Sequence, residues 1–249
     1  MGNKSTAIVI TKTRRFADLY TTNREILRAK VLDKNLEVAV GQVVEYKVED
    51  DYNFVTAVIE PKNKFERSYQ KKTKVIAVNL DLLFVVTAIG PLFNHQFIDR
   101  VLATGAIESI PSILIVNKMD LDDEASKSQI EIYRKIGIEV IETSAKNNFG
   151  IDEIVGRLAD AAIEIVALAG VSGVGKSTIL NLLVPSAEQR TNEVSEKTGQ
   201  GRQTTSQPLG HIYKCSDSRE KILIDLPGIQ NFGIENFTEK RSCLWFFRI

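Results

Sequence analysis

The sequence predicts an α/β protein in which a small all-β domain precedes a larger domain built on a parallel sheet. Three observations predict this class. Short valine-rich segments separated by turn residues occupy the first third of the chain. Apolar, strand-like runs then alternate with helical patterns, which is typical of βαβ units. A glycine-rich phosphate-binding loop follows one of these runs at residues 170–177.

In the first third, turn residues such as Gly41 and Asn53 separate the predicted strands, which suggests a small antiparallel barrel or sandwich. These strands cover residues 27–32, 37–48 and 54–61. The next stretch, 61–74, holds six basic residues against one acid and is expected to be a linker. Residues 1–30 are also basic, with seven Lys or Arg against two acids.

The rest of the chain alternates between strands and helices. The predicted strands are 80–89, 112–120, 138–145, 163–170 and 221–228. The predicted helices are 94–109, 124–136, 151–161 and 176–184. Residues 185–207 are polar and have no apolar period, so this long connection is either functional or mobile.

Composition excludes several classes of protein. The formal net charge is zero and the pI is near 6.8, so overall charge directs the chain toward neither nucleic acid nor membrane. The two cysteines, Cys215 and Cys243, form no metal-binding pattern, and no apolar run is long enough for a membrane helix. A reducing cytoplasm without disulfides or membrane contact is therefore expected.

The phosphate-binding loop matches the G-x-x-x-x-G-K-[ST] pattern in its usual place between a strand and a helix. Its glycines allow backbone N–H groups to turn toward a phosphate, and the following helix points its positive end there. Lys176 is expected to bridge the β- and γ-phosphates, and Ser177 to hold Mg²⁺. The phosphate-binding residues are predicted to be Gly170, Ser172, Gly173, Val174, Gly175, Lys176, Ser177 and Thr178.

Two segments predict that the base is guanine. In Asn117-Lys118-Met119-Asp120, an aspartate at a strand end accepts hydrogen bonds from guanine N1–H and the exocyclic amine, which adenine does not offer there. Lys118 is expected to lie along the base, and Asn117 to tie this loop to its neighbours. Thr143-Ser144-Ala145-Lys146 follows another apolar strand, where a backbone N–H near Ala145 can reach guanine O6.

Two further segments are expected around the γ-phosphate. Asp225-Leu226-Pro227-Gly228 ends a strand, so Asp225 is predicted to hold Mg²⁺ through water and the Gly228 N–H to meet the γ-phosphate. The stretch 199–206 supplies a threonine that can complete the Mg²⁺ coordination. This loop is then expected to order with the triphosphate and to be released after hydrolysis.

These motifs are those of a Ras-like GTPase in a different order, because the two base segments precede the phosphate loop. The chain resembles a circularly permuted GTPase, and with its small β domain it resembles the ribosome small-subunit-dependent GTPase A family (RsgA, or YjeQ). The resemblance implies an OB-fold at 1–70, a GTPase domain at 71–232 and the remnant of a C-terminal extension at 233–249. It also implies a monomer that binds the small ribosomal subunit and its rRNA during late maturation and hydrolyses GTP slowly alone but faster on the ribosome.

The chain departs from this family in two places. Gln203 stands where the family usually has a histidine that positions the attacking water, so Gln203 becomes the candidate catalytic residue beside Lys176. Of the neighbouring threonines, Thr205 best matches the family's Mg²⁺ position. The chain also ends at 249, where the family's zinc domain begins, so GTP or GDP and Mg²⁺ are expected but zinc is not; the end is either natural or a truncation.

Two other functions stay open from the sequence. One is a GTP-dependent RNA-binding module with little or no turnover, which Gln203 and the short C-terminus suggest. The other is an ATP-dependent P-loop enzyme, which competition between ATP and bound GTP would reveal.

Overall fold

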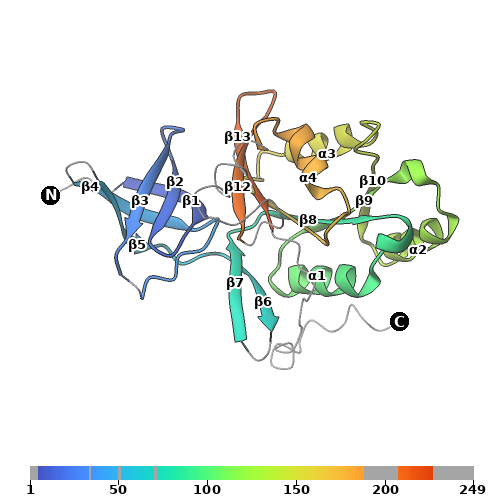
Figure 1. Cartoon of the computed structure of the whole chain (residues 1–249), viewed down its shortest axis with the longest axis horizontal. Helices are drawn as coiled ribbons and strands as arrows, with labels where there is room; N and C mark the ends of the chain where they lie inside the picture. The colour runs from blue at the N-terminus through green and yellow to red at the C-terminus, as the bar shows by residue number, and fades with distance from the viewer. Residues whose placement is uncertain (1–4, 34, 50–51, 70–71, 188–206, 227–249) are drawn as a thin grey trace.

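The structure is a computed structural model that describes residues 5–33, 35–49, 52–69, 72–187 and 207–226. Figure 1 shows two bodies side by side, with a small barrel at one end and a sheet flanked by helices at the other. The predictions for Gln203, Thr205, Gly228 and the remnant at 233–249 fall outside the described residues.

The N-terminal body is a closed barrel of five strands in the order β1-β2-β3-β5-β4. β3 and β5 pair in parallel, while the other pairs are antiparallel. The alternating pattern buries one side of each strand in the barrel, and this confirms the predicted OB-like domain. The strands are β1 (Ser5–Lys12), β2 (Phe16–Thr21), β3 (Ile26–Val31), β4 (Val43–Glu49) and β5 (Tyr52–Val58).

Residues 61–74 are not the linker that their charge predicts. They contribute to an antiparallel hairpin of β6 (Lys64–Tyr69) and β7 (Lys72–Val78). Phe65 and Ile76 are buried in the same hydrophobic core as the large sheet, whereas Thr73 and Lys74, nearer the turn of the hairpin, are exposed. Charged residues outnumber apolar ones in this part of the sequence, so a hairpin with one solvent-exposed face resembles a charged linker.

The second body is a six-stranded sheet in the order β10-β9-β8-β11-β13-β12. All neighbouring pairs are parallel except β12 with β13, which is antiparallel. Continuous apolar strands bury both faces, as expected for a parallel sheet. The strands are β8 (Leu82–Ala88), β9 (Ser112–Asn117), β10 (Glu139–Glu142), β11 (Ile165–Gly170), β12 (Leu209–Lys214) and β13 (Glu220–Asp225).

Helices cover the two faces of this sheet (Figure 1). Apolar residues of α1 (His95–Ile107) and α2 (Glu124–Lys135) belong to the core cluster on one face. Those of α3 (Ile151–Leu158) and α4 (Lys176–Leu183) belong to the cluster on the other. Two short 3₁₀ helices, η1 (Gly90–Leu92) and η2 (Met119–Leu121), follow β8 and β9.

The barrel packs directly on the sheet through β1 and β12. A Cβ on Gly210 of β12 would lie 3.0 Å from the carbonyl oxygen of Ile10, a tight contact, so glycine favours the close approach of the two strands. Ile10 is fully buried in the same cluster as the sheet residues. The Tyr20 hydroxyl of β2 also donates a hydrogen bond to Glu220 of β13. Apolar packing and a hydrogen bond therefore both join the two bodies.

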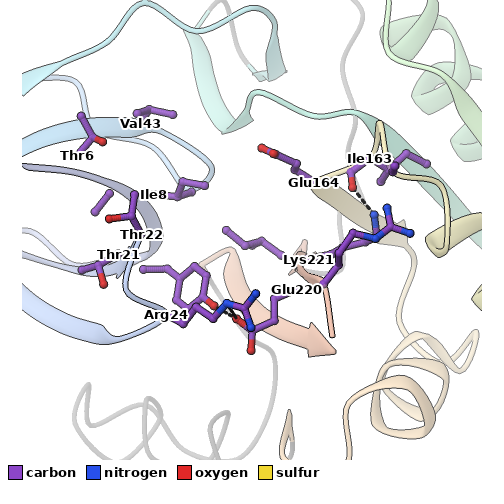
Figure 2. A pocket seen from close by; sticks show the side chains of 15 residues that line it. Thr6, Ile8, Thr21, Thr22, Arg24, Val43, Ile163, Glu164, Glu220 and Lys221 are labelled. Carbon is purple, nitrogen blue, oxygen red and sulfur yellow. Dashed lines mark hydrogen bonds and ion pairs between the residues drawn. The ribbon is translucent and has the colours of Figure 1, made fainter. Parts of the chain in front are cut away.

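A cleft of about 460 Å³ lies beside this contact, between β1 and β2 of the barrel and the start of β13. Figure 2 shows Arg24 pointing toward Glu220, with their charged atoms 3.7 Å apart. Lys221, also labelled there, donates to the carbonyl oxygen of Ile163 and is itself buried.

Candidate nucleotide site

The site lies where the carboxyl ends of the central strands meet. β9 ends at Asn117, β11 at Gly170 and β13 at Asp225, and these strands run in parallel. The same edge of the sheet therefore receives the base loop, the phosphate loop and the predicted Mg²⁺ ligand. Open α/β sheets place their ligands at this edge.

The phosphate loop runs from the end of β11 to the start of α4. Gly173 and Gly175 adopt φ of 85° and 93°, a left-handed conformation that favours glycine. Val174 between them is fully buried and fixes the loop to the sheet, whereas Ser177 and Thr178 are exposed. No side chain caps the N-terminus of α4, so its backbone N–H groups and positive end face the loop. This arrangement suits a phosphate group.

Asn117 joins the phosphate loop to the base segments. Its Nδ2 donates to the carbonyl oxygen of Val174 at 2.8 Å, and its Oδ1 accepts from the Ala145 backbone N–H at 2.9 Å. The Thr143 hydroxyl donates to the same Oδ1 at 3.2 Å. The close approach needs a glycine, because a Cβ on Gly175 would lie 2.1 Å from Asn117 Nδ2. The predicted tying role of Asn117 therefore has a direct geometric basis.

Asp120 is held in place by the second base segment. The Ser144 hydroxyl donates to Asp120 Oδ1 at 2.6 Å. This hydrogen bond is the main cause that lowers the pKa of Asp120 below its usual value, and Lys146 and Lys118 lower it further. Asp120 is exposed, so its carboxylate is accessible to a ligand. The pair can present an ionised acceptor to a base.

Lys176 and Asp225 form a buried ion pair. Lys176 Nζ donates to Asp225 Oδ1, and the two side chains keep only 10% and 7% of their exposure. In the structure, the residues predicted to hold phosphate and Mg²⁺ thus neutralise each other. If a ligand draws Lys176 toward its phosphates, the Asp225 carboxylate loses its partner and becomes available to bind a cation.

The donor set at this corner fits Mg²⁺. Asp225 supplies a carboxylate and Ser177 a hydroxyl at the start of α4, and Mg²⁺ prefers such oxygen ligands together with substrate phosphates. Elsewhere, the described part of the chain brings together no group of three His, Cys, Asp or Glu side chains that could hold a metal. None of the described helices is both long and apolar enough to cross a bilayer.

The structure brings most predicted residues together. Lys118 follows β9 in a left-handed conformation with φ of 64°, and Lys146 is exposed beside Asp120. The sequence interpretation missed that Thr143 organises this loop, since its carbonyl oxygen also accepts from the Met119 N–H at 3.0 Å. The signal available in the sequence was the threonine directly before Ser144 at the end of an apolar strand. Gln203, Thr205 and Gly228 lie outside the described residues and stay predictions.

A phosphate loop on the central strand and base segments that precede it in the chain define a P-loop GTPase domain with circularly permuted motifs. A family model described as "RsgA GTPase" matches residues 58–235. The small ribosomal subunit biogenesis GTPase RsgA of Paraburkholderia phytofirmans is 36% identical over 220 residues, covering 84% of this chain and 67% of that relative. The protein of that name from Paraburkholderia xenovorans is 35% identical over 216 residues, with the same coverage. The chain belongs to the RsgA GTPase family.

Solved structures show the same fold. YjeQ from Thermotoga maritima superposes with a TM-score of 0.69 at 24% identity, covering 93% of this chain and 77% of that one. YloQ, described as a circularly permuted GTPase, gives a TM-score of 0.60 at 21% identity, covering 93% of this chain and 74% of that one. Both likenesses confirm the predicted architecture of a barrel followed by a permuted GTPase domain.

Proposed function

We propose that this protein binds GTP with Mg²⁺ and hydrolyses it to GDP and phosphate while it is bound to the small ribosomal subunit during late maturation. The observation that carries the proposal is the set of hydrogen bonds from Asn117 to Val174 and Ala145. They hold a phosphate loop and a base loop in one site. The names of its relatives, which are small-subunit biogenesis GTPases, support the choice of partner.

Guanine selection rests on Asp120 and the loop at 144–146. The Asp120 carboxylate accepts two hydrogen bonds from the guanine edge, while the Ala145 region offers a backbone donor to O6. A base that lacks these donors leaves the aspartate unpaired, and this costs far more affinity than a lost apolar contact. The hydrogen bond from Ser144, together with the charges of Lys146 and Lys118, lowers the pKa of Asp120 and favours its ionised form.

Phosphate binding rests on the backbone of Gly173–Ser177 and on Lys176. Ser177 and Asp225 would hold Mg²⁺, with Thr205 as a further ligand. When bound, the ion neutralises charge on the phosphate oxygens. Because Lys176 and Asp225 are paired in the structure, binding exchanges one set of charge partners for another.

Catalysis in this proposal depends on Gln203, which orients the attacking water, and on the Gly228 N–H at the γ-phosphate. Glutamine orients water but does not act as a general base, so turnover is expected to be slow for the protein alone. Contact with the small subunit positions the catalytic groups and accelerates hydrolysis. The domains are assigned as 1–70, 71–232 and 233–249, and the protein is proposed to act as a cytoplasmic monomer on rRNA.

Exchange of Asp120 for Asn tests the base site. Asp120→Asn is expected to move the preference from GTP toward XTP, because an amide donates a hydrogen bond to the xanthine 2-carbonyl where the carboxylate accepted one. Competition of both nucleotides against a fluorescent GDP measures the change. Asp122→Asn, two residues away in an exposed ion pair with Lys127, is the matched control. An unchanged GTP preference in Asp120→Asn would mean that this loop does not read the base.

A second function is a GTP-dependent RNA-binding module with little turnover, which Gln203 favours because the family's usual histidine is absent. Gln203→His separates the two functions. A large gain in turnover on the small subunit would show that glutamine limits catalysis. Equal and substantial turnover of both proteins would establish the native chain as an enzyme.

A further inference from the structure

The connection that follows β8, residues 89–93, begins beside the base loop. β8 lies between β9 and β11 in the sheet and runs parallel to both, so its carboxyl end emerges between the base loop and the phosphate loop. The Ile89 N–H donates to the carbonyl oxygen of Asn117 at 3.1 Å. The connection then forms the short helix η1, which the Phe93 N–H closes by donating to the carbonyl oxygen of Gly90 at 2.9 Å. One end of it is therefore fixed to the base loop.

The N-terminus of α2 holds the same end of this connection. The Gly90 N–H donates to the hydroxyl oxygen of Ser126 at 2.9 Å, and this hydroxyl donates to Asp123 Oδ2 at 2.5 Å. Ser126 is 3% exposed, so its hydroxyl finds both partners inside the protein. Asp123 caps α2 and follows Asp120 closely in the chain. The connection is thus tied to the helix into which the base loop leads.

Leu92, near the far end of the connection, reaches the phosphate loop. Its Cδ1 lies 3.7 Å from the position that a Cβ on Gly173 would take, which is an ordinary van der Waals distance. Apart from chain neighbours of Gly173, no other residue that the structure describes has an atom within 4 Å of that position. The carbonyl oxygen of Leu92 accepts from the buried Thr87 hydroxyl at 3.2 Å, so its backbone is fixed to β8. The side chain also packs against the core cluster that contains Val174.

The phosphate loop has reason to need a contact at Gly173. Gly173 and Gly175 both have positive φ, and glycine loses more conformational freedom on folding than any other residue. The loop is suited to bind phosphate through backbone N–H groups, whose directions depend on this backbone. Val174 between the glycines is anchored in the core, but Gly173 has no side chain of its own to pack. A neighbouring side chain that packs on Gly173 restricts this part of the loop.

We propose that Leu92 is a positioning residue for the phosphate loop, and that residues 89–93 connect the position of the base loop to that of Gly173. The contact keeps the loop N–H groups in the arrangement that binds phosphates and thereby slows the release of GDP. Leu92 has no polar side-chain atom and acts through Gly173. The inference deepens the proposed function and rests on it, because it requires that this loop holds a nucleotide.

The rate of GDP release, measured with a fluorescent GDP chased by excess unlabelled GDP, tests the role of Leu92. Leu92→Ala removes the contact, so release is expected to be about tenfold faster, with a smaller change in the association rate. Leu92→Val should give an intermediate rate. Leu92→Met refills the space and should bring release back to within about twofold of the native rate. Leu36→Ala, at a partly buried leucine of the barrel core, removes the same atoms and is the matched control.

The tie to the base loop is tested through Ser126. Ser126→Ala leaves the Gly90 N–H without its partner, so it should also speed GDP release, but by less than Leu92→Ala does. In the double variant the two effects should not add, because both act on the same connection. Additive effects would show that Ser126 does not act on the phosphate loop through residues 89–93.

Three further results decide the proposal. Native release of GDP from both Leu92→Ala and Leu92→Val would show that the contact does not hold the loop. Equally fast release from Leu36→Ala, at matched loss of denaturation midpoint, would reduce the effect to a general loss of packing. A native protein that does not bind GDP would contradict the proposed function itself. Tight GDP binding by the native protein, with unchanged release from the Leu92 variants, rejects only the positioning role.

Discussion

The side chain of Asn117 donates a hydrogen bond to the carbonyl oxygen of Val174 at 2.8 Å, although 57 residues separate them. This bond brings the base loop at the end of β9 against the phosphate loop at the end of β11. In the chain the base loop comes first, but in space the two loops form one site. Permuting the motifs changes where the domain begins and leaves this contact possible, because β9 and β11 both pair with β8, which lies between them in the sheet.

Loss of the Asn117 amide is expected to weaken the site as a whole. Asn117→Ala leaves the Val174 carbonyl and the Ala145 N–H without their buried partner, so the free energy of unfolding should fall by about 1–3 kcal/mol. GDP affinity should fall as well, since both loops lose their alignment. Chemical denaturation and calorimetric titration measure the two effects, with exposed Asn23→Ala of the barrel as the control. A variant with native GDP affinity would contradict the tying role.

The pH dependence of guanine binding should follow Asp120. The Ser144 hydroxyl lowers the pKa of this carboxyl, so the ionised acceptor persists further into acid than an ordinary aspartate does. In Ser144→Ala the pKa rises toward its usual value near 3.9, and affinity for GDP should begin to fall at a higher pH during acidification. Ser128→Ala on α2 provides the comparison. If GDP affinity falls at the same pH in Ser144→Ala and in the native protein, the Ser144–Asp120 hydrogen bond does not set the pH dependence of binding.

Mg²⁺ and GTP are expected to bind cooperatively because of the Lys176–Asp225 pair. When Lys176 turns to the phosphates, the Asp225 carboxylate needs Mg²⁺ as its new partner. Removing Mg²⁺ with a chelator should therefore weaken GTP binding strongly in the native protein and much less in Asp225→Asn, where no negative charge is left behind. Titrations with and without chelator give this comparison. An equal loss of GTP affinity in both proteins would show that Asp225 does not hold the ion.

The same variant also tests the pair in the nucleotide-free protein. Asp225→Asn leaves a buried Lys176 without its carboxylate, and loss of one member of a buried pair costs about 3 kcal/mol or more of stability. The double variant Lys176→Met with Asp225→Leu should recover much of this loss, because no buried charge remains. Denaturation midpoints of the three proteins compare these effects.

Tyr20 and Glu220 connect the barrel to β13, whose other end holds Asp225. Burial, followed by the hydrogen bond to Glu220, raises the pKa of Tyr20 to about 12. The contact favours the neutral phenol, so its stabilising effect is present below the usual tyrosine pKa of about 10 and is lost as the pH rises through about 12. A double-mutant cycle of Tyr20→Phe and Glu220→Gln should give a coupling of about 1 kcal/mol at neutral pH. No coupling would show that the contact does not hold the bodies together.

Sequence patterns predict the sheet and its loops well for a physical reason. Buried parallel strands such as 82–88 are continuously apolar, and the glycines and polar residues after them are required by the site itself. The pattern fails for 64–78, where charged residues flank Phe65 and precede the short apolar run 75–78, and for β12, where Gly210 and His211 interrupt the apolar run. A hairpin with one solvent-exposed face and an edge strand both lack the continuous apolar run that marks a buried strand.

Contacts between distant residues could not be predicted in the same way. The pairing of Lys176 with Asp225 depends on β11 and β13 being neighbours, which spacing along the chain does not reveal. The link from Tyr20 to Glu220 joins residues 200 positions apart and depends on how the barrel packs on the sheet. The roles of single motif residues follow from their chemistry, whereas their partners follow from the topology.

GTP turnover by the purified protein, measured side by side with small subunits, with large subunits and alone, tests the central claim most directly. We expect slow hydrolysis alone, a marked increase with small subunits and none with large subunits. Asp122→Asn should behave as the native protein does, and Asp120→Asn should lose the GTP response. Tight GTP binding without any increase on small subunits would contradict the proposed activity and favour the RNA-binding module.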